Sequence, residues 1–228
     1  MNKPAIILLS GGLDSTTCAA IAKKNDYDLH GLTINYGQKH NYEIKAAKLV
    51  AQNFRFNSHA IININLASFG GSSLVSEELE VPKNRNLEHE KEIPSTYVPA
   101  RNTVFLSIAL AKAETISAFD IFIGVNAVDY SGYPDCRPEF ILQFEKMMNV
   151  ATKDAVQGNQ KYKIHTPLIK LTKADIIRKG HQLGVDYKIT SSCYTPNQYG
   201  QPCGQCDACK LRIKGFSDAG MIDPLTYK

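Results

Sequence analysis

The stretch most suggestive of chemistry is the hexapeptide Ser10-Gly-Gly-Leu-Asp-Ser15, which follows a short apolar run and opens a helical pattern. Two adjacent glycines permit positive φ and close approach of the backbone to an anion, and N–H groups at a helix N-terminus attract phosphate. The hydroxyls of Ser10, Ser15 and Thr16 add donors. The stretch matches neither the Walker loop nor the dinucleotide-binding G-x-G-x-x-G motif. A tight turn with Asp14 as helix N-cap is the alternative, but the full hexapeptide favours a phosphate-binding loop.

Four cysteines in the last third of the chain have the spacing of metal ligands. They form the pattern C-x9-C-x2-C-x2-C and are Cys193, Cys203, Cys206 and Cys209. Four thiolates suit tetrahedral Zn²⁺, whereas the spacing does not match the ferredoxin pattern of an iron–sulfur cluster. A site closed by four sulfurs leaves no position for water or substrate, so we expect a structural Zn²⁺. Cys18 is predicted to pack in the core, and Cys136 is either packed or a substrate-facing thiol.

Three polar stretches could hold a second substrate, and they cover residues 36–43, 98–102 and 124–140. The second places Arg101 and Asn102 at the N-terminus of an apolar helix, which suits phosphate or carboxylate. The third combines acids, tyrosines, an Asn and an Arg, which together offer the donors, acceptors and stacking faces that a planar heterocycle requires. Ordinary caps, surface groups and self-bonded turns are the alternatives to these binding roles.

The elements that must position these residues alternate along the chain. Apolar runs predict strands at 5–9, 29–35, 58–66, 120–126 and 164–169. Helical patterns cover 15–24, 42–54, 103–117, 139–156 and 173–183, the last with Thr172 as its N-cap. This alternation predicts an α/β fold with a doubly wound parallel sheet, whose ligands bind beyond the carboxyl ends of the strands. We expect one α/β domain over residues 1–190 and a small C-terminal zinc-binding segment, 191–228, packed on it.

Residues 70–95 interrupt the alternation. They contain six Glu, no aromatic residue and no sustained periodicity. Such a composition predicts a long mobile loop or lid.

Composition and charge narrow the class of protein. With 43% hydrophobic and 21% charged residues, the chain of 228 residues is globular, which excludes collagen, coiled coil and wholesale disorder. The net charge is +4, and residues 161–228 hold 11 basic against 5 acidic residues. This excess of positive charge suits the binding of an anionic small molecule. It is smaller than the clustered Lys and Arg residues expected of a protein that binds duplex nucleic acid. No secretory pattern or membrane-spanning run is visible, so we expect a cytoplasmic protein without disulfides.

The hexapeptide resembles the pyrophosphate loop, SGGxDS, of the ATP pyrophosphatases. In that superfamily ATP is split between the α and β phosphates, an oxygen nucleophile is adenylated, and the loop holds the departing pyrophosphate. The resemblance implies that Asp14 helps to coordinate Mg²⁺, a hard cation that prefers carboxylate oxygen. Taken with the polar stretches and Cys-Gly-Gln-Cys-Asp-Ala-Cys209, nearly the whole chain resembles the 7-cyano-7-deazaguanine synthase family of queuosine biosynthesis.

That resemblance implies a reaction and a set of partners. The reaction converts 7-carboxy-7-deazaguanine, ammonia and ATP into 7-cyano-7-deazaguanine through an adenylated acid, an amide and an adenylated amide, with release of AMP and pyrophosphate and without ADP. The implied cofactors are ATP, Zn²⁺ and Mg²⁺. The implied assembly is a homodimer, with no direct nucleic-acid or membrane partner.

The resemblance also implies site residues. The implied catalytic residues are Ser10, Asp14, Ser15, Arg101 and Asp129. The implied ATP-binding residues are Leu8, Leu9, Ser10, Gly11, Gly12, Leu13, Asp14, Ser15, Thr16, Thr17 and Cys18. The implied substrate-binding residues are Tyr36, Gln38, Arg101, Asn102, Asn126, Asp129, Tyr130, Asp135 and Arg137.

Two rival functions share the phosphate loop. One is a tRNA-modifying adenylating enzyme of the thiolase kind, although no appended RNA-binding domain is visible. The other is a zinc-stabilised nucleotide-binding module without catalysis. Because the chain begins with Met1 and has no room for a fused glutaminase domain of roughly 200 residues, we expect nitrogen to enter as free ammonia.

Overall fold

The computed structural model describes residues 2–85, 92–126 and 132–228. Asp129 and Tyr130, two of the predicted site residues, lie outside these ranges. The sheet has five strands: β1 (Lys3–Leu8), β2 (Tyr27–Asn35), β3 (Ser58–Asn63), β4 (Asp120–Phe122) and β5 (Lys163–His165). Their order is β3-β2-β1-β4-β5, and every neighbouring pair is parallel. The predicted doubly wound parallel α/β fold is confirmed.

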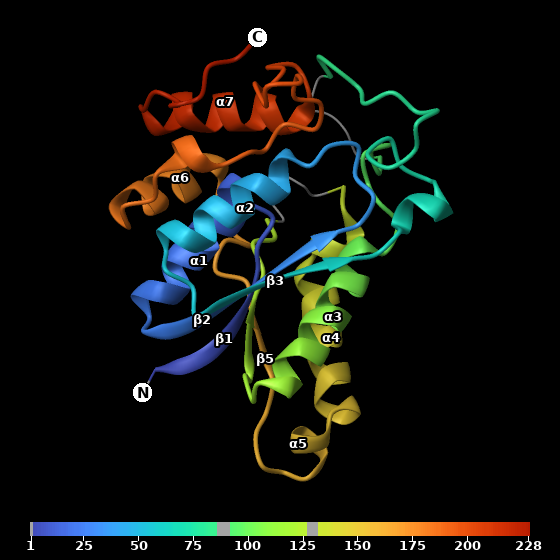
Figure 1. Cartoon of the computed structure of the whole chain (residues 1–228), viewed down its shortest axis with the longest axis vertical. Helices are drawn as coiled ribbons and strands as arrows, with labels where there is room; N and C mark the ends of the chain where they lie inside the picture. Colours follow the sequence, from blue (N-terminus) through green and yellow to red (C-terminus); the bar gives the residue numbers. More distant parts are fainter. Residues whose placement is uncertain (1, 86–91, 127–131) are drawn as a thin grey trace.

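Helices cover both faces of this sheet (Figure 1). The longer helices are α1 (Leu13–Lys24), α2 (Tyr42–Asn53), α3 (Arg101–Thr115), α4 (Pro138–Ala151), α6 (Lys173–Gln182) and α7 (Asp207–Ala219). Residues of α1, α2 and α6 pack on one face, and residues of α3 and α4 pack on the other. Side chains of β1 alternate between the two cores, because Ala5 and Ile7 join the first while Ile6 and Leu8 join the second.

Three predicted elements end earlier than expected. The third strand stops at Asn63, since Asn65 accepts a hydrogen bond from the Ser68 backbone N–H at 3.2 Å and opens a short 3₁₀ turn. The fourth and fifth strands keep only the three residues that pair in the sheet. Each strand therefore gives way to loop at the edge where ligands bind in such folds.

The predicted helix over 139–156 is broken in two. Thr152 has extended backbone angles, and its hydroxyl donates to the carbonyl of Met148 at 2.9 Å. The chain resumes as the short helix α5 (Lys153–Val156). By contrast, Thr172 caps α6 as predicted, and Asp175 completes a reciprocal capping box with it.

The described part of the expected mobile loop, residues 70–85 and 92–95, is packed against the body of the protein. Leu74, Val75 and Val81 are buried in the same core as the four cysteines. Lys83 forms an antiparallel bridge with Cys206, and Arg85 pairs with Asp207 at 2.9 Å. Residues 70–85 therefore form a loop that is packed at Leu74, Val75 and Val81, and its predicted mobility stays a prediction.

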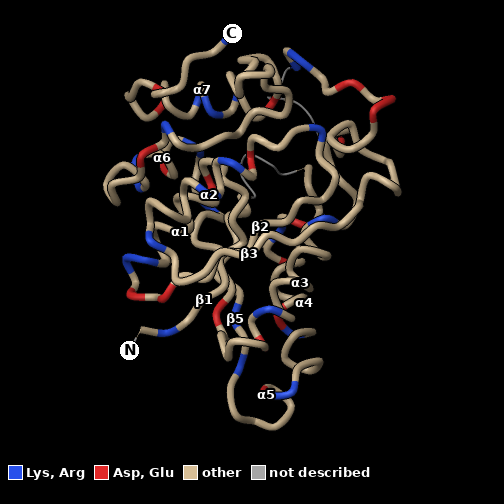
Figure 2. Tube along the Cα trace, viewed as in Figure 1, with Lys and Arg blue, Asp and Glu red and all other residues tan. Residues whose placement is uncertain are grey.

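Charges are spread along the chain. In Figure 2 the Lys and Arg positions are scattered among Asp and Glu positions over the length of the trace. Among the described residues, no helix is long and apolar enough to cross a membrane.

Candidate nucleotide and substrate site

The hexapeptide forms a tight loop between the carboxyl end of β1 and the start of α1. Gly11 has a φ of +80°, and Gly12 is the N-cap residue, so Asp14 lies in the first turn of the helix and not at its cap. The Ser10 hydroxyl accepts a hydrogen bond from the Gly12 backbone N–H at 3.2 Å and donates to the Ser15 hydroxyl at 3.0 Å. Backbone N–H groups and hydroxyls thus gather at a helix N-terminus that faces the mouth of the sheet.

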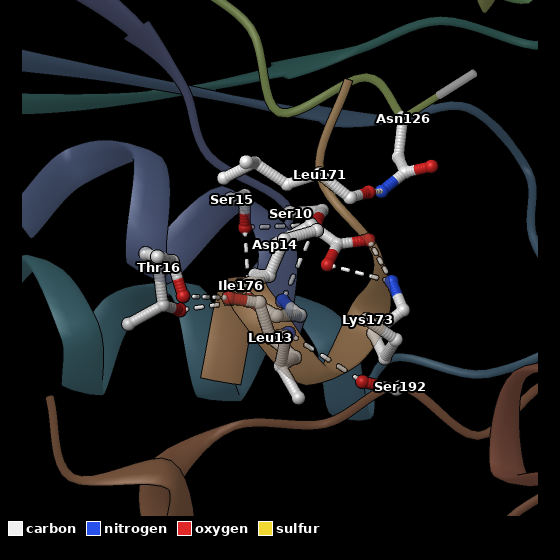
Figure 3. A network of polar contacts seen from close by, with 12 residues as sticks. Ser10, Leu13, Asp14, Ser15, Thr16, Asn126, Leu171, Lys173, Ile176 and Ser192 are labelled. Carbon is white, nitrogen blue, oxygen red and sulfur yellow. Dashed lines mark hydrogen bonds and ion pairs between the residues drawn. The ribbon is translucent and has the colours of Figure 1, made fainter. Parts of the chain in front are cut away.

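Asp14 is held by a lysine from the far end of the sequence. The Lys173 ammonium group, in the first turn of α6, donates to both carboxylate oxygens of Asp14 at 2.7 Å (Figure 3). Lys173 is 8% exposed and Asp14 21% exposed at the side chain. Both oxygens therefore accept hydrogen bonds from Lys173 in this conformation, and Mg²⁺ coordination by Asp14 stays a prediction from the resemblance.

The segment before the first clustered cysteine docks on the same loop. The Ser191 backbone N–H donates to the carbonyl of Gly11 at 2.9 Å, and the Leu13 backbone N–H donates to the Ser192 hydroxyl at 3.4 Å. Figure 3 shows Ser192 below the loop, on the side opposite Asn126. The loop is thus fixed from two sides by residues near the C-terminus.

A cavity of about 230 Å³ opens beside this loop at the carboxyl ends of the strands. Twelve of the predicted site residues line it: Leu8, Leu9, Ser10, Gly12, Leu13, Asp14, Ser15, Tyr36, Gln38, Arg101, Asn102 and Asn126. The structure thus brings together the loop, the end of β2 and the N-terminus of α3. Residues of the cysteine segment, including Ser192 and Tyr194, complete the wall.

Four predicted ATP-binding residues do not line the cavity. Gly11 faces the backbone of α2, where a Cβ would lie 2.4 Å from the Ala47 nitrogen. Thr16, Thr17 and Cys18 are buried within α1, and burial raises the pKa of the Cys18 thiol. Their contribution is to the packing of the helix that carries the loop.

Two predicted substrate-binding residues also lie away from the cavity. The Asp135 carboxylate accepts a hydrogen bond from the Asn102 backbone N–H at 3.0 Å, so it fixes the start of α3. Arg137 is exposed at the N-cap position of α4. Cys136 does line the cavity, but burial and the neighbouring Asp135 raise its pKa to about 12, which describes a packed thiol.

One wall of the cavity combines a cation, a phenol and a carboxyl group. The Arg101 guanidinium lies 5.7 Å from the centre of the Tyr36 ring. Glu43, in the first turn of α2, faces the same space. Burial raises the pKa of Glu43 to about 7, although the charge of Arg101 lowers it. The wall can therefore bind an anion through Arg101 and hold a proton on Glu43.

The four predicted metal ligands come together behind this cavity. Their sulfur atoms all lie within 4.8 Å of one another, and all four side chains are buried. Backbone N–H groups point at the sulfurs: Cys203 donates to the Cys193 sulfur at 3.2 Å and Cys206 to the Cys203 sulfur at 3.3 Å. Four sulfurs around Zn²⁺ at about 2.3 Å would lie about 3.8 Å apart. The cluster therefore fits a tetrahedral metal ion with small adjustments.

Comparison with known proteins identifies the family. The model described as queuosine biosynthesis protein QueC matches residues 4–220. The chain belongs to the QueC family. A 7-cyano-7-deazaguanine synthase from Citrifermentans bemidjiense is 57% identical over 228 residues, which are 100% of this chain and 99% of that protein. One from Desulfatibacillum aliphaticivorans is 58% identical over 227 residues, covering 99% and 97%.

The QueC fold also resembles a solved structure of low sequence identity. NMN synthetase from Francisella tularensis superposes with a TM-score of 0.51 at 16% identity, over 97% of this chain and 79% of that one. At this identity the likeness shows the fold alone, which is the doubly wound parallel α/β fold predicted from the sequence.

Sequence reasoning missed several residues of this QueC site. Lys173 had no visible signal, because a lysine at the start of an expected helix looks like a surface residue. Ser191, Ser192 and Tyr194 flank the first clustered cysteine, and this position in the sequence could have marked them as site residues. Glu43 belonged to the predicted polar stretch 36–43, but the sequence did not reveal the burial that raises its pKa.

Gly11 and Gly12 are expected to respond differently to the same substitution. Gly11→Ala places a Cβ 2.4 Å from the Ala47 nitrogen at positive φ and should lower the free energy of unfolding by about 2–4 kcal/mol. Gly12→Ala should change it by less than about 1 kcal/mol, because its Cβ would lie no nearer than 3.3 Å to Ser10 Oγ and 3.5 Å to Ser191 O. Urea denaturation followed by circular dichroism measures both. Equal stabilities would refute the loop geometry.

Proposed function

We propose that the chain catalyses the ATP-dependent conversion of 7-carboxy-7-deazaguanine and ammonia to 7-cyano-7-deazaguanine, releasing AMP and pyrophosphate. One observation carries this proposal beyond family membership. The phosphate loop and the polar wall with Arg101 line one continuous cavity, so a nucleotide phosphate and a second, anionic substrate can meet there.

The loop end of the cavity suits the phosphates of ATP. The backbone of residues 10–13, at the start of α1, would receive the pyrophosphate, with the Ser10 and Ser15 hydroxyls beside it. Lys173 adds a positive charge on the other side of Asp14. Because Asp14 already accepts two hydrogen bonds from that lysine, we assign no step to Mg²⁺ on this residue, and its metal role stays a prediction from the resemblance.

The other end suits a planar acid. Arg101, over the face of Tyr36, can bind the carboxylate of the substrate, and the half-buried rings of this wall can lie against a heterocycle. Asn126 lies across the cavity, where its side-chain amide donates to the Leu171 carbonyl at 2.7 Å. The binding roles of Gln38, Asn102, Asp129, Tyr130, Asp135 and Arg137 stay predictions.

The chemistry needs two activations in one place. A carboxylate becomes a good electrophile only when its oxygen is adenylated, and ammonia then displaces AMP to give the amide. A second adenylation, on the amide oxygen, lets AMP depart as the carbon–nitrogen triple bond forms. A fixed phosphate loop beside a site for the heterocycle can serve both rounds, because proximity and orientation are shared.

The cysteine cluster would hold Zn²⁺ as a structural ion. Its four sulfurs lie behind the cavity, and binding would contribute folding free energy to the segment that completes the cavity wall. The homodimer, the cytoplasmic location and the division of the chain at residue 190 stay predictions.

The central test is the set of products formed from ATP, ammonium and the deazaguanine acid. Mass spectrometry of the wild-type reaction should show the nitrile, AMP and pyrophosphate, with free ammonium as sufficient nitrogen donor. ADP as the main product would reject the pyrophosphate loop. Modification of tRNA without the nitrile would favour the thiolase-like rival, and nucleotide binding without turnover would favour the non-catalytic module.

Asp14→Asn should impair both turnover and folding. We expect kcat to fall by about 10²-fold or more, because the Asp14 carboxylate holds the Lys173 ammonium group beside the phosphate loop. The free energy of unfolding should fall by about 1–3 kcal/mol, since a buried ammonium group loses its ion pair with Asp14. Pyrophosphate release at saturating ATP and urea denaturation give the two values.

Asp218→Asn is the matched control for Asp14→Asn. Asp218 also pairs with a lysine, Lys214, but the two side chains are 49% and 66% exposed. This change should leave kcat unaltered and stability within about 0.5 kcal/mol. Pyrophosphate production by Asp14→Asn at the rate of the control would remove Asp14 from the mechanism.

Cys206→Ser should prevent metal binding and thereby destabilise the fold. The wild-type protein should contain about one Zn²⁺ per chain by elemental analysis, whereas the variant should be insoluble or melt at a far lower temperature. Cys136→Ser, a buried cysteine outside the cluster, should keep its zinc. Iron with labile sulfide in the wild type, or an unchanged melting temperature without metal, would contradict a structural zinc site.

A further inference from the structure

A second cavity of about 10 Å³ adjoins the large one and shares Tyr36, Gln38 and Glu43 with it. This is about the space that one water molecule needs. Of the substrates in the proposed reaction, only ammonia or ammonium is that small. The size and position of the cavity therefore suit the nitrogen donor and exclude ATP and the heterocycle.

One histidine of the small cavity has a ring nitrogen without a hydrogen-bond partner among the described residues. His40 lines it, and its Nδ1 is buried without a hydrogen-bond partner among the described residues. In the tautomer of a neutral imidazole that carries its proton on Nε2, this Nδ1 is an acceptor. An unpaired buried acceptor calls for a small ligand with N–H or O–H donors.

Glu43 supplies a second acceptor, and it lines both cavities. The one lysine of this lining, Lys39, donates from its ammonium group to the Leu79 carbonyl at 2.7 Å, so its charge is directed toward the loop at residue 79. A carboxylate and an imidazole nitrogen around a water-sized space favour a small cation with several N–H donors over a neutral ligand.

We propose that the small cavity binds ammonium and that Glu43 removes its proton, which delivers ammonia to the activated carboxyl carbon in the large cavity. This inference rests on the proposed function. The pKa of about 7 that burial imposes on Glu43, against the lowering effect of Arg101, supports it, because a carboxyl group near neutrality can accept a proton and release it again.

The step balances in atoms and charge. Glu43 accepts one proton from ammonium, and the electron pair freed on nitrogen forms the bond to the carbon of the adenylated acid. The bond from that carbon to the AMP oxygen breaks, and AMP leaves with the bonding pair. The nitrogen then gives one further proton to water, which leaves the neutral amide, and Glu43 returns its own proton to water.

Only one half of the proposed reaction uses this site. Conversion of the acid to the amide consumes ammonia, whereas conversion of the amide to the nitrile consumes ATP but no ammonia. A defect confined to the small cavity should therefore spare the second half. A defect in ATP binding, heterocycle binding or folding would affect both halves.

The experiment compares Glu43→Gln with wild type in two assays on the full-length protein, one from the acid with ammonium and one from the amide alone. We expect kcat/KM for ammonium to fall by about 10²-fold or more, while nitrile formation from the amide stays within about twofold. Glu139→Gln is the matched control, because Glu139 is also an acid in the first turn of a helix but is exposed. It should leave both assays unchanged.

The outcomes separate this inference from the proposed function. A wild-type protein that makes no nitrile from either substrate overturns the proposed function. Active wild type with equal loss in both assays, or no loss, for Glu43→Gln overturns the ammonium site. Should Glu43→Gln fail to fold, Glu43→Asp, which keeps a carboxylate but withdraws it from the cavity, must still show the loss in the ammonium assay alone.

Discussion

The ion pair between Asp14 and Lys173 joins the N-terminus of α1, which carries the phosphate loop, to the N-terminus of α6. The dipole of α6 disfavours a positive charge in the first turn of the helix. The Asp14 carboxylate offsets this electrostatic cost for Lys173 and accepts two hydrogen bonds from it. The lysine stem is fixed in turn by α7, where a Cβ added to Gly215 would lie 2.4 Å from Lys173 Cγ. Lys173 therefore packs against α7 and pairs with the phosphate loop, so it connects the two.

The cysteine segment acts on the site through structure. It begins with Ser191 and Ser192, which hydrogen-bond the loop, and it continues to Tyr194 and Ala208, which line the cavity. The cluster itself lies behind this wall with its sulfurs buried. A metal held there would make no contact with substrate and would act on the cavity only through the segment that lines it.

Much of the fold was predictable because its signals are local. The alternation of apolar runs with helical patterns predicted the parallel sheet, and Thr172 with Asp175 marked the start of α6. The features that the sequence did not reveal depend on residues that are distant along the chain. Lys173 pairs with Asp14, 159 positions away. The Glu-rich stretch after residue 70 packs on the protein, where Arg85 pairs with Asp207. The break at Thr152 was also invisible, since a single hydroxyl bonded to a preceding carbonyl decides it.

The span of these contacts has a consequence for synthesis on the ribosome. The loop that opens the first helix is bonded to Ser192, 179 positions later, so the site cannot close until most of the chain has left the exit tunnel. Parallel pairing of β1 with β4 imposes a similar delay. During that interval the glycine loop and the edge of β1 that later pairs with β4 lack their native partners.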